Sequence, residues 1–489
     1  MHKLPDSIWK LRSLCEVYFI NPVKVSGAPW ELPTDIRMLQ NLELLEVDDC
    51  HLEGQIPYGI GRLSPLRSLS LSCTNVSEVP KTISMLPCLQ RLELYCNKIQ
   101  ELPMLPISLT HLNVSSKSLW LVPNLSNLTN LIELKLHGAS GESKFCSGEL
   151  WWIGKLSKLK TLSLRLNNVY APAKLASLPH LNELYMSILD LQTYPQFPLS
   201  LEKLFLTTYN STLSNLRNLS FFCLWESPMQ EIQIDGFQLP YLRELVVAKC
   251  EALESIGLSS IRKLKAFLVD DCGKLVEIQF SWASESLEHF TIHNCRSFKR
   301  LVCMGEAGHD NDETANKMIS CEGRLILSTK ALQKLQRFDL SGDNGIFEIQ
   351  VVGSSASWEV FSVSGCPSLR SLRGLPNLKN LQSLSVFTCS GLQVVEGLDQ
   401  LECLKELKVW NCRSLEIDLS TTKLPDDCDT YIDHCKKLCG FEKRFVGPLQ
   451  SYKRDKEQEP KQKQESRFKQ EQESIDQKKK DKKGTGKPL

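Results

Sequence analysis

The sequence has no apolar run long enough to cross a membrane. None of its uninterrupted apolar stretches approaches the roughly 20 residues that a membrane-spanning helix requires. Its first residues, MHKLPDSIWKLRSL, also lack the basic segment, apolar core and small-residue cleavage site of a secretory signal. We therefore expect no membrane span and a cytoplasmic location.

The spacing of a disulfide framework is missing as well, although the chain has 19 cysteines. That number is odd, and the cysteines are spread along the whole chain rather than concentrated in one short domain. Reduced thiols in a reducing compartment are therefore the better interpretation.

Motifs for catalysis, metal binding and nucleotide binding are also missing. His289 and His293 are four residues apart on a candidate strand, about 13 Å, which is too far to share a zinc ion. The segment CDTYIDHCKKLC would need Cys435, which the repeat described below already uses. GTGK near the C-terminus lacks the spacing of a phosphate-binding loop. We predict no catalytic residues, no enzyme activity, no cofactor and no metal.

A strong charge of one sign is absent from most of the chain. The net charge is +1, but from Gln450 onward 13 Lys and Arg face 8 Asp and Glu, a surplus of five positive charges. The rest of the chain therefore has a net charge of about −4, which offers no general field for phosphates. We predict that the folded part does not bind nucleic acid.

One pattern, L-x-x-L-x-L-x-x-C-x-x-L, recurs along the chain, for example in LRELVVAKCEAL and LKELKVWNCRSL. Cys50 and Asn97 take the cysteine position in the first half. In the second half this position recurs mostly at intervals of 22 or 23 residues, at Cys250, Cys272, Cys295, Cys366, Cys389, Cys412 and Cys435. Pattern and period match the leucine-rich-repeat signature, and about 17 turns fit between Leu4 and Leu438.

The fold predicted from this pattern is an α/β repeat solenoid, a leucine-rich-repeat horseshoe with a parallel β-sheet on its concave face. Residues such as Leu381, Leu384 and Val386 point inward and stack on those of neighbouring turns. The Cys or Asn after each strand is predicted to form a structural ladder that hydrogen-bonds backbone otherwise buried without a partner. An I-x-x-L element, as in Ile83 and Leu86, predicts a short helical turn on the convex side.

Changes in the pattern divide the chain into three parts. Residues 1–236 have turns with a Leu-Pro or similar pair, and residues 237–446 have the cysteine ladder, with a polar insertion near 303–328. Residues 447–489, rich in Lys, Gln and Glu, have too few apolar residues to form a core, so we predict a disordered tail. Its run from Lys478 to Lys483 would be compatible with nuclear entry.

The residues that alternate with the buried strand positions are the candidates for binding, because they face the concave surface in parallel columns. Exposed aromatics beside a basic residue have the composition of a binding hot spot, whereas aromatics also simply favour strands. The candidate partner-binding residues are Phe387 and Trp410 on neighbouring turns with Lys408 beside them, then Tyr185 with Phe205, and Tyr95 and His293.

Segments such as ELPTDIRMLQNLELLEVDDC and EVPKTISMLPCLQRLEL, followed by LVVAKCEALESI and LPNLKNLQSLSVFTCSGLQVVEGL, resemble the repeat region of plant intracellular disease-resistance proteins of the TIR-type nucleotide-binding group, in the style of the flax rust resistance proteins. The resemblance covers nearly everything from Leu4 to Leu438. It implies a module that recognises a pathogen effector or a guarded host protein and restrains upstream signalling domains. This sequence contains no such domains and no phosphate loop, so no nucleotide chemistry is carried over. Met1 falls within a repeat frame, so we expect a fragment, a truncated product or a chain that needs other subunits.

Two other interpretations of the function remain open. HLEGQIPYGIGRL resembles the turn of plant cell-surface receptor ectodomains, but this turn occurs once only. A substrate adaptor of a ubiquitin ligase is the third reading, although no F-box-like helical segment precedes the repeats.

Overall fold

The structure is a computed structural model, and it describes most of the chain up to residue 439. The described residues are Ile8, 10–20, 28–48, 51–138, 150–166, 174–187, 196–207, 216–280, 286–304, 317–319, 323–418, 423–435 and 437–439. The predicted tail at 447–489, most of the insertion near 303–328 and the ladder candidate Cys50 lie outside these residues.

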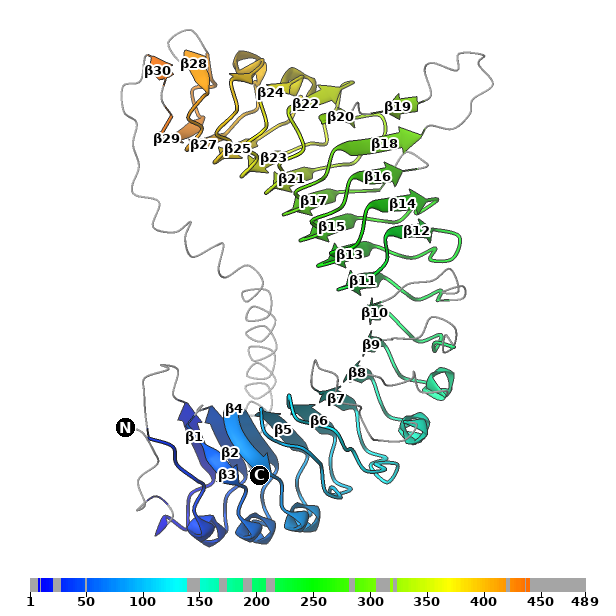
Figure 1. The fold of residues 1–489 in the computed structure, drawn as a ribbon, viewed down its shortest axis with the longest axis vertical. Helices are drawn as coiled ribbons and strands as arrows, with labels where there is room; N and C mark the ends of the chain where they lie inside the picture. The colour runs from blue at the N-terminus through cyan, green and yellow to red at the C-terminus, as the bar shows by residue number, and fades with distance from the viewer. Residues whose placement is uncertain are drawn as a thin grey trace, which may run out of the picture. The chain divides into compact units, whose positions relative to one another are not determined.

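One parallel sheet runs through the whole repeat array, with one strand from each turn, and we call it the front sheet. Its strands line the inner edge of the curved array from β1 to β29 (Figure 1). They are β1 (Glu16–Ile20), β2 (Leu44–Asp48), β4 (Ser68–Glu78), β5 (Arg91–Cys96), β6 (His111–Ser115), β7 (Glu133–His137), β8 (Thr161–Arg165), β9 (Glu183–Met186), β10 (Lys203–Leu206), β11 (Phe221–Trp225), β13 (Glu244–Ala248), β15 (Ala266–Asp270), β17 (His289–His293), β21 (Arg337–Ser341), β23 (Val360–Ser364), β25 (Ser383–Phe387), β27 (Glu406–Trp410) and β29 (Asp429–Asp433).

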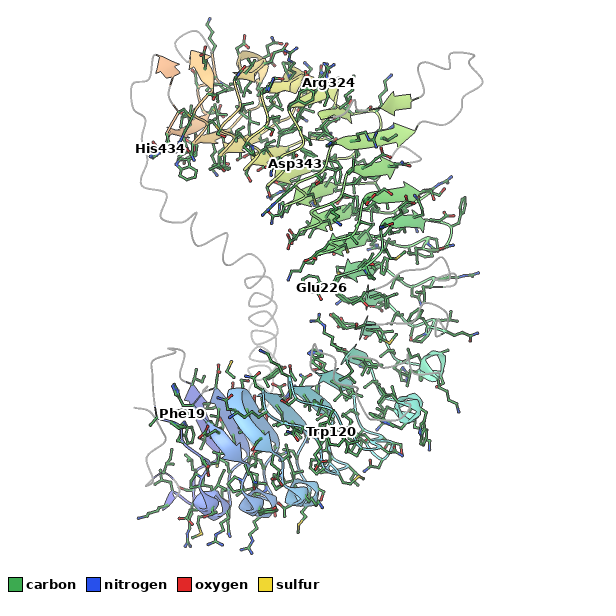
Figure 2. The ribbon with its side chains drawn as sticks, in the orientation of Figure 1. Phe19, Trp120, Glu226, Arg324, Asp343 and His434 are labelled. Atoms are coloured by element: carbon green, nitrogen blue, oxygen red, sulfur yellow. The ribbon has the colours of Figure 1, made fainter. Side chains whose placement is uncertain are left out.

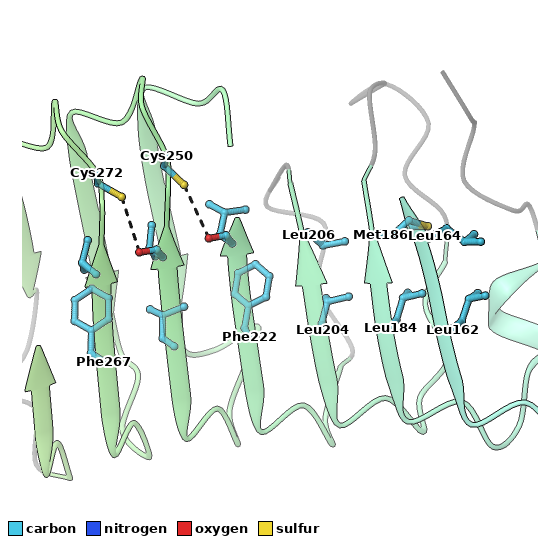
Figure 3. Close-up of a cluster of buried hydrophobic side chains, with 14 of the residues drawn as sticks. Leu162, Leu164, Leu184, Met186, Leu204, Leu206, Phe222, Cys250, Phe267 and Cys272 are labelled. Atoms are coloured by element: carbon cyan, nitrogen blue, oxygen red, sulfur yellow. Dashed lines mark hydrogen bonds between the residues drawn. The ribbon is translucent and has the colours of Figure 1, made fainter. Parts of the chain in front are cut away.

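This ladder of parallel strands confirms the predicted horseshoe. The two inward positions of each strand are buried and stack along the array. Leu162, Leu184, Leu204 and Phe222 are register partners on successive strands, and Figure 3 shows their side chains in one row. Because each leucine is covered by the turns on either side, a single turn cannot bury its own core.

The proline-containing turns of the first half form short 3-10 helices on the outer side of the array. In three of them a proline precedes the helix and its carbonyl accepts a hydrogen bond from the isoleucine N–H, as in Ile36 to Pro33, 3.1 Å, and Ile83 to Pro80, 3.0 Å. The predicted helical turns are therefore present as 3-10 helices. The described 3-10 helices of the first half are η2 (Thr34–Met38), η3 (Tyr58–Arg62), η4 (Lys81–Met85), η5 (Trp151–Lys155) and η6 (Leu175–Ser177), and those of the second half are η7 (Leu375–Asn377) and η8 (Leu398–Gln400).

Many turns of the second half place a further strand opposite the front sheet, which we did not predict. The first of these back strands, β12, begins at Glu231. The chain segment LESIGLS shows why they form, because its alternating apolar residues Ile256 and Leu258 are buried. The back strands are β12 (Glu231–Asp235), β14 (Ser255–Ser259), β16 (Glu277–Phe280), β18 (Arg300–Met304) and antiparallel β19 (Lys317–Ile319), then β20 (Arg324–Ser328), β22 (Glu348–Val352), β24 (Ser371–Arg373) and β26 (Val394–Val395), and finally β28 (Glu416–Asp418) with β30 (Lys437–Cys439). One more short strand, β3 (Glu53–Gln55), pairs with the end of β4 in the first half.

The cysteine ladder forms as predicted in the second half. The Cys250 thiol donates to the Leu224 carbonyl at 3.9 Å and the Cys272 thiol to the Val247 carbonyl at 3.9 Å, the two dashed lines of Figure 3. The side chains of Cys250, Cys272, Cys295, Cys366, Cys389 and Cys412 are buried, and Cys435, at the end of the ladder, is partly buried. All seven are free thiols. A thiol is a weak donor, so its main contribution is to fill a small buried space while it covers a strand carbonyl.

Each of these cysteines follows a residue with a positive φ angle. Lys249, Asp271 and Asn411 have φ angles of 53°, 54° and 53°, and Gly365, before Cys366, has 61°. This left-handed residue turns the chain inward after the strand, so that the next side chain points into the core.

The ladder prediction was wrong for Asn97, which is exposed. The buried residue of that turn is Cys96, whose sulfur lies 2.9 Å from the Thr74 hydroxyl oxygen. No left-handed residue follows β5 before the ladder position, so the inward side chain comes one residue earlier than in the other turns.

Candidate functional site

The register of the front sheet places three columns of side chains on the concave face. Along the middle column Ser385, Lys408 and Tyr431 are register partners, and in the column beside it so are Phe387, Trp410 and Asp433. Neighbouring residues in a column stand about 4.8 Å apart, so several side chains can contact one partner without reordering the backbone.

The last strands of the sheet bring together Trp410, Tyr431, His434 and Lys408, which we call the C-terminal aromatic cluster. The centroids of the Trp410 and His434 rings are 6.1 Å apart, and the rings are arranged edge to face. The Lys408 ammonium lies 5.9 Å from the centre of the Tyr431 ring. Trp410 is 36% exposed. Figure 2 shows His434 at the end of the front sheet, on its inner edge.

Polar contacts hold the side chains of this cluster in place. The Lys408 ammonium lies 2.6 Å from a Glu406 carboxylate oxygen, and Ser383 donates to the other oxygen at 2.9 Å. His434 Nδ1 lies 2.9 Å from a carboxylate oxygen of Asp433. The lysine therefore needs little further ordering to meet an acidic or aromatic group of a partner.

The interpretation of Phe387 as an exposed binding residue was wrong. Phe387 and Trp410 are register partners, as predicted, but Phe387 is only 7% exposed. Its register partners are Ser364 on β23 and Trp410 on β27, so the largely buried ring lies beside Trp410 rather than offering a contact surface of its own. Tyr431 and His434 take its place in the cluster, and both follow one strand further along, where the sequence pattern gave no cue to stacking.

Tyr185 and Phe205 are adjacent, as the sequence indicated, and their rings stack with centroids 3.9 Å apart. Phe221, which the sequence analysis missed, extends this stack with a centroid 4.9 Å from that of Phe205. All three side chains are partly buried.

Tyr95 and His293 lie far from the C-terminal aromatic cluster. Tyr95, on β5, is 40% exposed, and burial together with nearby Glu93 and Glu133 raises its pKa to about 12. His293 ends β17 beside Asp270 of β15, where burial raises the pKa of the Asp270 carboxyl and the His293 imidazole partly opposes this rise. The candidate residues thus form separate groups along the array.

Trp225 is a concave aromatic that the sequence analysis missed. It pairs in register with Ala248, and the Lys249 ammonium lies 4.6 Å from the centre of its ring. Phe222, three residues earlier on the same strand, is fully buried and points into the core.

The structure defines a class of protein, a solenoid of stacked parallel turns whose concave sheet is held by a ladder of small buried side chains. The chain matches the family described as leucine-rich repeat region over residues 42–341, which is more than half of its length. It therefore belongs to that family and is a leucine-rich-repeat protein-interaction module. Among the described residues no helix is long and apolar enough to cross a bilayer, and no group of three or more His, Cys, Asp or Glu side chains could hold a metal ion.

Solved structures with similar folds come from bacteria and plants. The functional domain of InlJ from Listeria monocytogenes, described as including a cysteine ladder, is 14% identical with a TM-score of 0.40, covering 85% of this chain and 72% of that one. The ectodomain of the plant membrane receptor kinase GASSHO1/SCHENGEN3 from Arabidopsis thaliana is 14% identical with a TM-score of 0.37, covering 88% and 71%. The protein LIC12759 of Leptospira interrogans is 17% identical with a TM-score of 0.36, covering 88% and 93%. At these identities and TM-scores no functional assignment follows.

Proposed function

We propose that this repeat array is the protein-recognition module of a plant intracellular disease-resistance receptor. In this role it works in the cytoplasm, binds a pathogen effector or a guarded host protein, and restrains signalling domains of a longer receptor. The repeat types of its two halves support the proposal by their resemblance to that group of receptors. The ladder of free buried thiols is compatible with a reducing compartment.

The observation that carries the binding part of the proposal is the C-terminal aromatic cluster. Trp410 and Lys408 of β27 stand beside His434 and Tyr431 on the next turn, at the end of a rigid sheet. Tryptophan and tyrosine dominate the binding energy of many interfaces, because large rigid rings bury much area at little entropic cost. We place the principal partner contact at this cluster.

Replacing Trp410 by alanine tests the site. Trp410→Ala should weaken partner binding by about 2 kcal/mol or more, as truncation of a hot-spot tryptophan does, while thermal melting stays unchanged because the ring is not in the core. The measurement is co-precipitation of the partner, paired with a plant cell-death assay on protein that accumulates normally.

Two control variants separate the site from general effects. Ser362→Ala lies on β23 and removes one hydroxyl from the same face, and Trp225→Ala truncates an aromatic on β11. Both should bind as wild type does. Normal partner binding by Trp410→Ala would refute the assignment of the site, and early melting would show that the ring is structural.

The alternative location of the chain, in the secretory pathway, can be tested through glycosylation. Asn113 lies in a sequon but is only 4% exposed, so it cannot accept a glycan in the folded chain, whereas the sequon residues Asn124 and Asn127 are exposed. Glycans at Asn124 or Asn127 of the native protein would place the chain in the secretory pathway and favour a receptor ectodomain over our proposal.

A further inference from the structure

The middle of the front sheet carries an apolar surface on its concave face, which we call the central apolar patch. It lies on β9, β10, β11, β13 and β15, strands whose inward side chains Figure 3 includes. Its side chains, all partly exposed, are Tyr185, Phe205, Phe221, Trp225, Val246 and Leu268. The proposed function places its principal contact elsewhere, at the C-terminal aromatic cluster, and does not use this patch.

The middle column of the sheet changes from polar to apolar and back again at this patch. Ser163 of β8 precedes the apolar run in register, and Thr291 of β17 follows it. The run between them is Tyr185, Phe205, Cys223, Val246 and Leu268. The fold requires apolar residues at the inward positions, whereas serine and threonine occupy the concave positions of the flanking strands without changing the register. Folding alone therefore does not account for this run, and a contiguous apolar surface of this kind marks an interaction site.

A positive charge stands at the amino-terminal end of the patch. Arg165 ends β8 and is exposed. Burial and then Cys250 raise the pKa of the Cys223 thiol to about 12, and Arg165 opposes this rise, so its charge acts across the patch as far as β11. Its register partner His137 is neutral at pH 7, because burial, then Arg165 and then Lys135 lower the pKa of the imidazole to about 4. Arg165 thus carries the charge at this end.

A negative charge stands at the other end. Asp270 ends β15 in the same column as Trp225, two strands further along, and the exposed Asp271 follows it in the chain. The Lys249 ammonium, 4.6 Å from the centre of the Trp225 ring, offsets one of these two carboxylates. The two ends of the patch therefore differ in sign, and a partner that fits both has an acidic group at one end and a basic group at the other.

The spacing of the strands suits an α-helix that lies along the array. Neighbouring strands are about 4.8 Å apart and a helix rises about 5.4 Å per turn, so one side chain from each turn falls over each strand. An extended segment repeats its side chains roughly every 6.6 Å on one face and loses step with the strands. From Arg165 to Asp270 the register crosses five strand spacings. This span is about 24 Å, the length of a helix of about 16 residues.

We propose that the central apolar patch binds an amphipathic α-helix of a second protein partner, with an acidic residue of the helix at Arg165 and a basic residue at Asp270. The apolar face of the helix packs on Phe205, Val246 and Leu268. A helix is itself stabilised by acidic residues in its first turn and basic residues in its last, so the bound helix runs in the direction from β8 to β15.

The test is fluorescence anisotropy on the full chain with fluorescein-labelled, alanine-based helical peptides of about 16 residues. The mixed peptide has leucines along one face, glutamates in its first turn and lysines in its last. The basic peptide has lysines at both ends, the scrambled peptide has the leucines spread around the helix, and the proline peptide has two central alanines replaced by proline. The mixed peptide should bind most tightly of the four.

Each comparison can overturn the proposal. Equal binding of the scrambled peptide would show that no apolar face is recognised, and equal binding of the proline peptide would show that the occupant is extended rather than helical. Equal or tighter binding of the basic peptide would show that the charges at the two ends do not select the partner.

A matched pair of lysine substitutions in the middle column locates the binding. Val246→Lys should weaken binding of the mixed peptide about tenfold or more, because the ammonium would lie beneath the apolar face of the helix. Ser362→Lys, in the same column on β23, should leave the affinity unchanged. Circular dichroism melts show whether both variants fold, and equal losses for the two would refute the site.

Charge reversal tests the ends of the patch independently of its core. Arg165→Glu makes both ends negative, so the basic peptide should then bind more tightly than the mixed peptide. Arg91→Glu, which reverses an exposed arginine on β5, should keep the wild-type order. An unchanged order with Arg165→Glu, or the same switch with Arg91→Glu, would contradict the proposal. Trp410→Ala should bind all four peptides as wild type does, so failure here leaves the proposed function standing.

Discussion

At the scale of single residues, Asp343 is the exception in the ladder. It follows the left-handed Gly342, as Cys366 follows Gly365, and it is fully buried (Figure 2). Its Oδ1 accepts hydrogen bonds from the N–H groups of Gly345 and Ile346 at 2.7 and 2.9 Å, while Oδ2 has no partner among the described residues. Burial raises the pKa of this carboxyl to about 7, although the two N–H groups lower it.

This carboxyl should make stability depend on pH. Its pKa is near 3.9 in the unfolded chain and about 7 in the folded chain, so between these values only the folded chain holds the proton. Its stabilising effect is present below about pH 4 and is lost as pH rises through 7. Asp343→Asn keeps an acceptor for both N–H groups without the charge, so at pH 8 it should raise the free energy of unfolding by about 1 to 3 kcal/mol.

Urea unfolding of wild type and variant at pH 4 and pH 8 measures this difference. Asp399→Asn, which changes an exposed carboxylate, is the control and should show no such change between the two pH values. A difference for Asp343→Asn that is the same at both pH values would show that the carboxyl does not titrate in this range.

Residue identities at the ladder were predictable where spacing repeated, but exposure was not. Cys250 and its equivalents follow from a period that only a stacked turn produces, and the segment LSGD aligns with VSGC, so Asp343 could have been found. Asn97 and Phe387 could not be assigned from the pattern. Whether each of these side chains is buried or exposed depends on the local φ angles and on the neighbouring side chains across the sheet.

At the scale of elements, aromatic rings take over from leucine in the middle of the core. Phe267, Phe290, Phe338 and Phe361 are register partners on β15, β17, β21 and β23. Their centroids are 5.3 to 5.8 Å apart, and Trp358 lies 6.2 Å from Phe338. The wider side chains fill the space between the front sheet and the back strands.

Phe338→Ala should therefore lower the free energy of unfolding. The side chain is fully buried and contacts rings on both neighbouring turns, so its loss leaves a cavity and should destabilise the chain by about 3 to 5 kcal/mol. Thermal and urea unfolding measure the effect. Phe347→Ala, which truncates a 42% exposed ring in the same region, should have a small effect, and equal losses for the two would contradict the packing described.

The sequence predicted the front strands and missed the back strands for one reason. The front pattern L-x-x-L-x-L repeats in every turn, whereas the back segments are short and vary, as in LESIGLS and LVEIQF. A short apolar alternation is compatible with a strand or a loop until neighbouring turns are known to align it. Pairing between turns, which no single segment encodes, decides the outcome.

At the scale of the whole repeat array, stability comes from neighbours rather than from a central core. Each turn buries its leucines only against the turns before and after it, so the effects of a core change should fade along the array. A sequence pattern predicts this arrangement well, because the period alone fixes which residues stack. It does not predict where partners bind, because the concave columns are free to vary.

Leu384→Asp tests this picture. Leu384 is fully buried and is a register partner of Phe361 on β23 and Leu407 on β27, so the variant places an unpaired carboxylate between three turns. The local cost should be several kcal/mol. Amide hydrogen exchange should show lost protection in β23, β25 and β27, while β4, β5 and β6 keep theirs.

Lys379→Asp, an exposed change in the same turn, should leave the exchange pattern unchanged. Unaltered protection in β25 of the Leu384→Asp variant would mean that the register is wrong, and equal loss from β4 to β27 would mean that the array unfolds as one cooperative unit instead of by neighbouring turns.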